Sequence, residues 1–224
     1  MKIGLQALGS TVLGLVAFGL LLFLPAGTFD YWQAWAYIGV FVVTSIGPSI
    51  YLAVKDPAAL ERRMQAGPGA ETRTVQKVIV SALFAAFVGL MVFSALDHHF
   101  GWSSVPPAVS VAGDALVAIG LGFAMFVVIQ NSYAAANVRV ESGQQVVTTG
   151  VYGFVRHPMY LGTLILTIGT PLALGSWWGL LFFVPGVVVL VFRILDEEKL
   201  LRQDLAGYDE YAEQVRYRLV PHVW

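Results

Sequence analysis

Six apolar stretches, each close to the length of a membrane span, account for most of this sequence. They lie near residues 5–25, 34–54, 78–96, 108–131, 158–174 and 177–195. A helix needs about 20 apolar residues to cross the hydrocarbon core of a bilayer. The composition agrees, because 57% of the residues are hydrophobic and only 12% are charged. The sequence therefore predicts an all-α, polytopic membrane bundle with about six transmembrane helices.

The first stretch resembles a signal peptide only superficially. Lys2 precedes an apolar segment, residues 3–24, that is longer than the core of about 7 to 15 residues in a signal peptide. We therefore expect a retained first span, with cleavage after Ala26 or Gly27 as the alternative.

The basic residues predict how the chain is oriented, because Lys and Arg accumulate in cytoplasmic loops. With the amino terminus inside, all 13 basic residues fall on the cytoplasmic side, mainly in 55–77, 132–157 and the carboxyl tail. The opposite loops contain no basic residue, and five of the six tryptophans lie in or next to them, as in an interfacial aromatic belt. We expect an even number of spans with both termini in the cytoplasm.

Charge and cysteine content exclude several kinds of site. The net charge is −1, so no basic field favours nucleic acid. The absence of cysteine excludes disulfides, thiolate metal ligands and a cysteine nucleophile. Asp97, His98 and His99 are adjacent but lack convergent ligands, so we predict no metal site and interpret them as structural.

The segment "GFVRHPMYLG", residues 153–162, places polar groups at the predicted start of the fifth span. Proline suits the first turn of a helix, so Pro158 is expected to begin it. A helix start favours anions, and Arg156 adds a forked cationic donor. The segment is therefore a candidate binding site for a carboxylate or phosphate.

The segment "RILDEEKL" ends the sixth predicted span with Arg193, Asp196, Glu197 and Glu198. The fifth and sixth helices would rise about 25 Å and about 28 Å, and only a tight turn joins them. The expected C-terminal hairpin therefore brings the helix start beside the carboxylates at the cytoplasmic level. Such a site fits a zwitterionic ligand. S-adenosylmethionine is one such ligand, although spacing alone does not single it out.

Three elements together resemble a known family. They are "VVTTGVYGFVRHPMYLG" at 146–162, "DEEKLL" at 196–201 and "GYDEYAEQVRYRLVP" at 207–221. This combination is similar to the isoprenylcysteine carboxyl methyltransferase family and its relatives among phospholipid and thiol methyltransferases. The resemblance implies a membrane-embedded enzyme that binds S-adenosylmethionine at the cytoplasmic face of its last two helices. It also implies that a lipid-like or small substrate enters sideways from the membrane lipids.

Carried over by position, the resemblance assigns cofactor contacts to one set of residues: Gly150, Tyr152, Arg156, His157, Pro158, Tyr160, Glu197 and Glu198. The catalytic candidates are Arg193, His157 and Glu197. Arg193 lies one helical turn before Glu197 and either pairs with it or faces a substrate anion. Asn131 and Asn137, with Gln130, are substrate-binding candidates, the alternative being hydrogen bonds between helices.

The three consecutive acids cannot share one role, because they point in directions about 100° apart on a helix. Glu198 is also spaced four residues before Arg202, which predicts a solvated pair. One of the two glutamates is then structural.

The resemblance implies an S-adenosylmethionine-dependent methyltransferase, with O-methylation of an isoprenylcysteine-type carboxylate as the favoured reaction. The alternatives are N-methylation of a phospholipid amine, S-methylation of a thiol, and a non-catalytic membrane carrier or assembly protein. A carboxylate nucleophile needs no general base, whereas an amine or thiol needs a proton acceptor; His157 and the glutamates are the candidates.

We expect a single integral membrane domain over residues 1–224. Residues 1–107 would supply variable N-terminal helices, and residues 108–224 the methyltransferase core. In the tail, residues 200–217, the sequence predicts short helices divided at Gly207. These either lie on the membrane surface or fold back over the bundle.

Overall fold

The computed structural model describes residues 2–134 and 137–224, and within them it is all helical, as predicted. The six long helices are α1 (Lys2–Ala26), α2 (Trp32–Lys55), α4 (Thr74–Phe100), α5 (Pro107–Gln130), α6 (Pro158–Ala173) and α7 (Phe183–Asp204). Two short helices are α3 (Pro57–Met64) and α8 (Tyr208–Gln214). Single 3₁₀ turns are η1 (Pro68–Ala70), η2 (Gly150–Gly153) and η3 (Trp178–Phe182).

Four helical segments in the described part of the chain are long and apolar enough to cross a membrane. They are Trp32–Lys55, Thr74–Phe100, Pro107–Gln130 and Trp178–Asp204. The segments Val12–Ala26 and Pro158–Ala173 are apolar but shorter. The structure therefore supports an integral membrane protein with several spans, whereas the count of six and the orientation in the membrane stay predictions.

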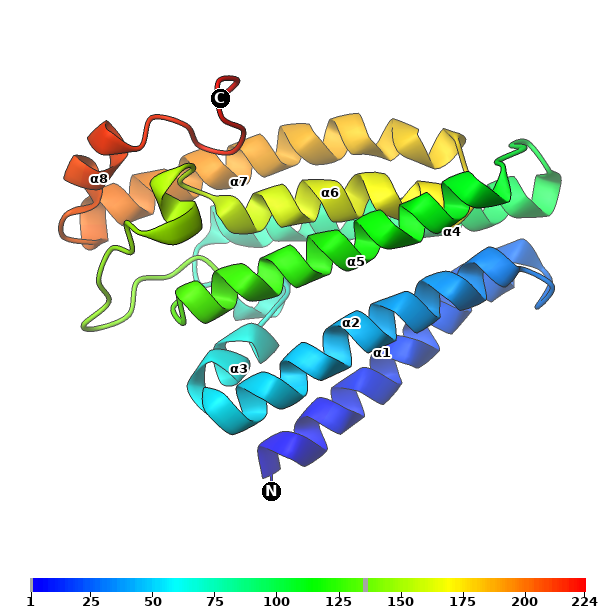
Figure 1. Cartoon of the computed structure of the whole chain (residues 1–224), viewed down its shortest axis with the longest axis horizontal. Coiled ribbons are helices and arrows are strands. Elements are labelled where there is room, and N and C mark those ends of the chain that lie inside the picture. Colours follow the sequence, from blue (N-terminus) through cyan, green and yellow to red (C-terminus); the bar gives the residue numbers. More distant parts are fainter. Residues whose placement is uncertain (1, 135–136) are drawn as a thin grey trace.

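The long helices run alternately back and forth, which sorts the connections to two ends of the molecule (Figure 1). The α1–α2, α4–α5 and α6–α7 connections lie at one end, and α3 and α8 lie at the other. Helix α3 contains Arg62 and Arg63, and the segment after α8 contains Arg216 and Arg218. The candidate site is therefore built at the end where the basic residues gather.

Proline and glycine set the helix boundaries where the sequence predicted them. Pro158 is the first residue of α6, which confirms the predicted start. Gly101 ends α4 in the left-handed conformation, with φ of 64°. The predicted end of the last helix at residue 195 is wrong, because α7 continues to Asp204. Hydropathy falls at residue 195, but the charged residues that follow are good helix formers.

Helices α5 and α6 pack with their backbones in contact. A Cβ atom added at Gly120 would lie 2.7 Å from the carbonyl oxygen of Gly162, and one added at Gly162 would lie 2.8 Å from the carbonyl of Gly120. Small residues permit such close approach between membrane helices. This contact fixes the position of α6, and with it the start of the candidate site.

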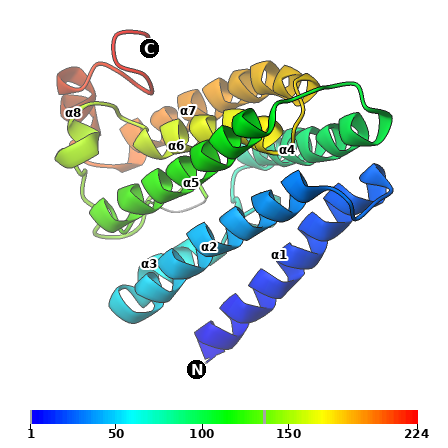
Figure 2. The same cartoon turned by 45° about the vertical axis from the view of Figure 1, so that its right-hand side comes forward.

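The first two helices form a pair beside the α4–α7 bundle (Figure 2). Leu22 of α1 and Tyr37 of α2 are fully buried in a core that also contains Met91 of α4 and Val117 of α5. The N-terminal pair is therefore packed against the core that carries the candidate site.

The residues Asp97 to His99 hold the far end of the bundle together. Asp97 accepts hydrogen bonds from the hydroxyls of Ser103 (2.6 Å) and Ser176 (2.5 Å), and the ring of His98 stacks on Tyr31. Asp97 therefore joins the end of α4 to the α6–α7 connection.

The carboxyl tail folds back over the bundle, one of the two arrangements expected. Gly207, with φ of 83°, separates α7 from α8. Beyond α8, the carbonyls of Tyr217 and Arg218 accept hydrogen bonds from the backbone N–H groups of Arg156 (2.9 Å) and His157 (2.8 Å). The tail therefore fixes the backbone immediately before α6.

Candidate active site

A buried carboxylate, Glu198, joins the start of α6 to the tail. Its Oε1 lies 2.8 Å from Nε of Arg156 and 3.3 Å from Nε2 of His157. Its Oε2 accepts a hydrogen bond from Nε of Arg218 at 3.0 Å. The two arginines and one glutamate carry a net positive charge, which favours an anion nearby.

The predicted pairing of Glu198 with Arg202 is wrong. Glu198 is only 4% exposed and its partners come from α6 and the tail. Arg202 instead pairs with Asp209 of α8. The i, i+4 spacing allowed the predicted pair, but Glu198 lies on the face of α7 that the α6 start and the tail cover.

Glu197, the residue before Glu198 in α7, faces Tyr160 instead. The Tyr160 hydroxyl donates to Oε2 of Glu197 at 2.5 Å and accepts from Nε of Arg193 at 2.9 Å. The Tyr160 ring also stacks on His157, with ring centroids 5.7 Å apart. Tyr160 thus links Arg193 to Glu197 and lies between the two polar groups of the site.

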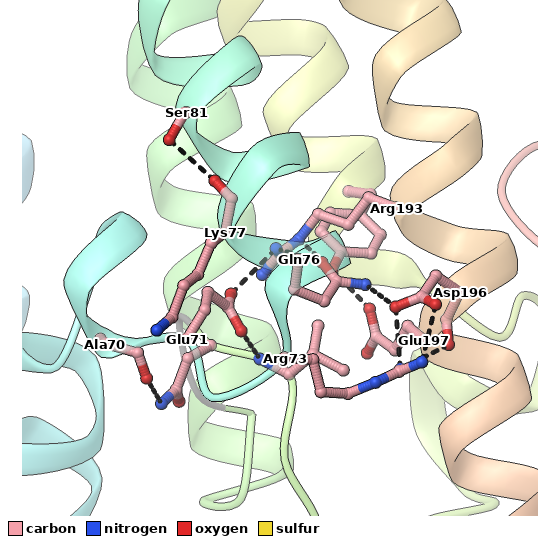
Figure 3. A network of polar contacts seen from close by, with 12 residues as sticks. Ala70, Glu71, Arg73, Gln76, Lys77, Ser81, Arg193, Asp196 and Glu197 are labelled. Atoms are coloured by element: carbon pink, nitrogen blue, oxygen red, sulfur yellow. Dashed lines mark hydrogen bonds and ion pairs between the residues drawn. The ribbon is translucent and has the colours of Figure 1, made fainter.

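Arg193 is buried in a network that reaches α4 (Figure 3). Its Nη1 donates to Oε1 of Glu71 at 3.0 Å and to Oε1 of Gln76 at 2.9 Å. Glu71 in turn accepts from the backbone N–H of Val138 through its other oxygen. The guanidinium is therefore fixed by residues that precede and begin α4.

The third acid, Asp196, points toward α4. Two nitrogens of Arg73 approach its two carboxylate oxygens, each at 2.8 Å, and Gln76 donates to it at 2.5 Å (Figure 3). Asp196, Glu197 and Glu198 thus have three different sets of partners, as their angular spacing on the helix predicts.

A cleft opens between α6, α7, α8 and the loop after α5. Its lining includes most of the residues selected from the sequence: Asn131, Asn137, Tyr152, Arg156, His157, Pro158, Tyr160 and Glu197. Gly150 and Glu198 do not line it. Arg193 does not line it either, and its contact with the cleft passes through the Tyr160 hydroxyl.

Gly150 has a structural role next to the cleft. Its φ is 61°, and a Cβ atom there would lie 1.7 Å from Nε2 of Gln130. Gln130 uses its side-chain oxygen to accept from the N–H of Val151 at 3.2 Å. Glycine therefore allows the loop to close against the end of α5.

The two asparagines differ in how their polar atoms are used. Asn131 donates to the Tyr152 hydroxyl at 3.2 Å and accepts from the N–H of Tyr133 at 3.1 Å. Asn137 donates to the carbonyl of Ala70 at 3.1 Å, but its buried Oδ1 has no hydrogen-bond partner. Asn137, a residue of the cleft wall, therefore has one buried acceptor without a partner.

Tyrosines from the tail complete the cleft, and sequence reasoning did not select them individually. Tyr208 and Tyr211 of α8 both line it. The Tyr211 hydroxyl donates to the carbonyl of Tyr152 at 2.8 Å, whereas the buried Tyr208 hydroxyl has no partner. Both lie in the tail motif "GYDEYAEQ", which was the only signal that could have identified them.

Burial changes the acidity of these phenols. It raises the pKa of Tyr152 to about 12, because the charged phenolate is poorly solvated, and the hydrogen bond from Asn131 offsets this only in part. Burial likewise raises the pKa values of Tyr208 and Tyr211 well above the ordinary range. All three phenols are therefore neutral hydrogen-bonding groups near neutral pH.

Comparison with known proteins identifies the segment that carries this cleft. Residues 109–206 match the family model described as phospholipid methyltransferase. This segment is therefore similar to phospholipid methyltransferases. The match contains all of α6 and α7 and most of α5, so it includes the helices that meet at Glu197 and Glu198.

Two individual relatives support the same group. Protein-S-isoprenylcysteine O-methyltransferase B of Arabidopsis thaliana is 28% identical over 165 residues, which cover 66% of this chain and 78% of that protein. Delta(14)-sterol reductase TM7SF2 of Mus musculus is 34% identical over 90 residues, 37% of this chain. That match spans only 21% of the reductase. The family match and the first relative confirm the resemblance recognised from the sequence motifs.

Proposed function

We propose that this protein is an integral membrane S-adenosylmethionine-dependent methyltransferase whose acceptor is lipid-like. The favoured reaction is O-methylation of an isoprenylcysteine-type carboxylate. The observation that carries the proposal is a shared wall: Met159 and Tyr160 line the polar cleft on one side and an apolar cavity between α4, α5, α6 and α7 on the other. Transfer of a methyl group from a polar donor to a lipid-soluble acceptor needs a polar compartment and an apolar compartment that share a boundary.

The polar cleft fits S-adenosylmethionine by its chemistry. The Arg156–Glu198–Arg218 cluster has excess positive charge for the donor's carboxylate, and Glu197 suits its ammonium group or ribose hydroxyls. The cleft is also lined by Asn137 and Tyr208, whose buried Oδ1 and hydroxyl have no hydrogen-bond partner. Leu201 and Leu205 add apolar wall for an adenine ring.

When bound, S-adenosylmethionine supplies a methyl group on a sulfonium, so that the acceptor oxygen bonds to carbon as the carbon–sulfur bond breaks and its electron pair stays on sulfur. The protein's part is to align the acceptor and to exclude water. Tyr160 forms the boundary, and Arg193 positions Tyr160 through its hydroxyl. A carboxylate acceptor loses no proton; for an amine acceptor, His157 and Glu197, which both line the cleft, are the candidates to take one.

The test is calorimetric titration of the detergent-purified protein with S-adenosylmethionine. Arg156→Lys keeps the charge but loses the forked donor, and Glu197→Gln keeps the size of the side chain but loses its charge, so each should weaken binding by about tenfold or more. The matched controls are Arg216→Ala and Glu213→Ala, which alter exposed residues outside the cleft. Absence of binding to the wild type, or equal binding by all four variants, would contradict the proposed site.

The acceptor is tested separately by transfer of a labelled methyl group. Prenylcysteines, phospholipid amines and lipid thiols should be compared, and the proposal expects the label in the prenylcysteine. Label in a phospholipid amine or a thiol would still indicate a methyltransferase, but with an acceptor other than a prenylcysteine.

A second candidate function is reduction of a lipid-soluble substrate. The observation that favours it is the local identity of 34% to the sterol reductase, which exceeds the 28% to the methyltransferase relative. A reductase would bind a hydride-donating dinucleotide in the polar cleft. Titration with reduced nicotinamide dinucleotides discriminates between the two, since the methyltransferase should bind S-adenosylmethionine and not these compounds.

A further inference from the structure

Two arginines line the apolar cavity behind Tyr160, and one of them, Arg63, is used by no function described above. The cavity walls are mostly aliphatic, including Leu83 of α4, Leu121 of α5, Leu166 of α6 and Leu190 of α7. Arg63 of α3 lines the same cavity. Arg193 also lines it, but its guanidinium is paired with Glu71. Arg63 therefore adds a second guanidinium to a compartment otherwise suited to a hydrocarbon chain.

Arg63 also lines a second groove, between α2 and α5. This groove contains Leu52 and Met125 and shares Leu121 and Arg63 with the first cavity. Arg63 thus lies where this groove and the apolar cavity meet, close to Met159 in the wall of the polar cleft. The separation from Nη1 of Arg63 to Sδ of Met159 is 3.3 Å.

The charge of Arg63 is not balanced by the protein. Its guanidinium forms no ion pair with any carboxylate in residues 2–134 and 137–224, and its side-chain contact is the neutral sulfur of Met159. Every other arginine except the exposed Arg216 has a carboxylate partner in the structure. The adjacent Arg62, for example, lies 3.0 Å from Glu141.

A half-buried cation without a counterion is costly, because the protein replaces its hydration without supplying a negative charge. Burial accordingly lowers the pKa of the Arg63 guanidinium. An anion arriving in the groove would offset this cost. The charge of the groove is therefore complementary to a negatively charged amphiphile.

We propose that Arg63 binds the carboxylate of the methyl acceptor, while the acceptor's apolar tail occupies the cavity between α4, α5, α6 and α7. This inference rests on the proposed methyltransferase function and names the residue that selects its substrate. The neutral methyl ester produced by the reaction no longer matches the charge of Arg63. The same contact thus favours substrate over product.

A carboxylate fits better than other anions for two reasons. One uncompensated guanidinium balances one negative charge, and its forked donors match the two oxygens of a carboxylate. In addition, a carboxylate at Arg63 places the nucleophilic oxygen itself near Met159, in the wall shared with the polar cleft.

The test compares two pairs of ligands by calorimetric titration of the full-length protein in detergent micelles. The first pair is N-acetyl-S-farnesylcysteine and its methyl ester, and the second is a lysophosphatidic acid and the corresponding monoacylglycerol. The wild type should bind the farnesylcysteine acid about tenfold or more tightly than its ester, the effect of one charged hydrogen-bonded contact. Arg63→Gln should remove this preference without weakening the ester, and Arg63→Lys should retain part of it.

The control variant is Lys55→Gln, which removes a positive charge from an exposed position at the end of α2 and should keep the preference. Because Arg63→Gln breaks no ion pair, its unfolding temperature should not fall. A preference that survives in Arg63→Gln, or one confined to the phosphate pair, would overturn the assignment. Titration of the same variants with S-adenosylmethionine separates the two proposals, since Arg63→Gln should bind it as the wild type does.

Discussion

The Tyr160 hydroxyl and the Glu197 carboxylate, joined by a hydrogen bond of 2.5 Å, connect the first turn of α6 to the charged part of α7. Arg193 donates to the same hydroxyl, so a cation and an anion on one helix meet at a phenol from the other. This arrangement leaves Glu197 facing the polar cleft and orients the Tyr160 ring as the wall toward the apolar cavity. The Tyr160 hydroxyl therefore couples that wall to both charged side chains of α7.

Replacement of Tyr160 by phenylalanine should affect turnover more than donor binding. The ring remains as a wall, but Arg193 and Glu197 lose the hydroxyl that joins them. We expect kcat for methyl transfer to fall by about tenfold or more, and the Kd for S-adenosylmethionine to change by less than about threefold. Labelled methyl transfer and calorimetry measure the two quantities. Tyr217→Phe is the matched control, and equal losses in both variants would contradict a role specific to Tyr160.

The Glu71–Arg193 pair should be worth more to stability than the Arg202–Asp209 pair. Glu71 and Arg193 are buried, with side-chain exposures of 1% and 6%, whereas those of Arg202 and Asp209 are 43% and 60%. Glu71→Gln leaves a buried cation with a weaker partner, and removing one member of a buried pair costs about 3–5 kcal/mol. Asp209→Asn should cost less than about 1 kcal/mol.

Thermal unfolding in detergent measures both effects, and Glu71→Gln should show the larger decrease in unfolding temperature. Similar decreases for the two variants would mean that burial does not distinguish these pairs.

The parts of this structure that follow from local rules were predictable from the sequence. Pro158 begins α6 because proline suits a first turn, and the alternation of apolar and charged segments placed the cleft residues at one end of the bundle. The directions in which the Glu197 and Glu198 side chains point were harder to predict from the sequence. Their spacing required them to diverge, but nothing local says that Arg218, from the folded-back tail, would reach Glu198 in place of Arg202.

Residues outside the recognised motifs were missed for a related reason. Glu71 lies in a polar segment between helices, "QAGPGAETRT", which sequence patterns describe only as a loop. Its contact with Arg193 depends on how α4 packs against α7, a long-range relationship that composition does not encode. Arg63 was counted only as a topology signal, because the absence of a nearby partner is visible only once the fold is known.

The contact between α5 and α6 predicts opposite effects at two glycines of the same helix. A Cβ atom at Gly120 would lie 2.7 Å from the Gly162 carbonyl oxygen, whereas one at Gly122 meets nothing within 4 Å. Gly120→Ala should therefore destabilise the protein by about 1–3 kcal/mol through overpacking. Gly122→Ala should be neutral or stabilising by up to about 1 kcal/mol, because alanine is the better helix former. Unfolding in detergent compares them, and a loss of stability in Gly122→Ala alone would refute the packing argument.

The carboxyl tail should be required for donor binding. Deleting residues 217–224 removes the carbonyls that accept from the N–H groups of Arg156 and His157, and it removes the Arg218 partner of Glu198. We expect the affinity for S-adenosylmethionine to fall by about tenfold or more, and amide exchange at residues 156 and 157 to accelerate. Tyr217→Phe keeps the backbone acceptor and should behave as the wild type does. Full affinity in the deletion variant would show that the α6 start holds its shape unaided.

Alkaline pH should destabilise the fold through the phenol of Tyr152. Burial raises the pKa of this group from 10.0 to about 12 in the folded protein. Below pH 10 the phenol is neutral in both states and its contribution to stability is fully present. As the pH rises from 10 toward 12, the unfolded chain ionises first, so the free energy of unfolding falls. Tyr152→Phe removes the ionisable group, and its free energy of unfolding should decline less steeply over this range than that of the wild type. Parallel declines would mean that the Tyr152 phenol ionises as readily in the folded protein as in the unfolded chain.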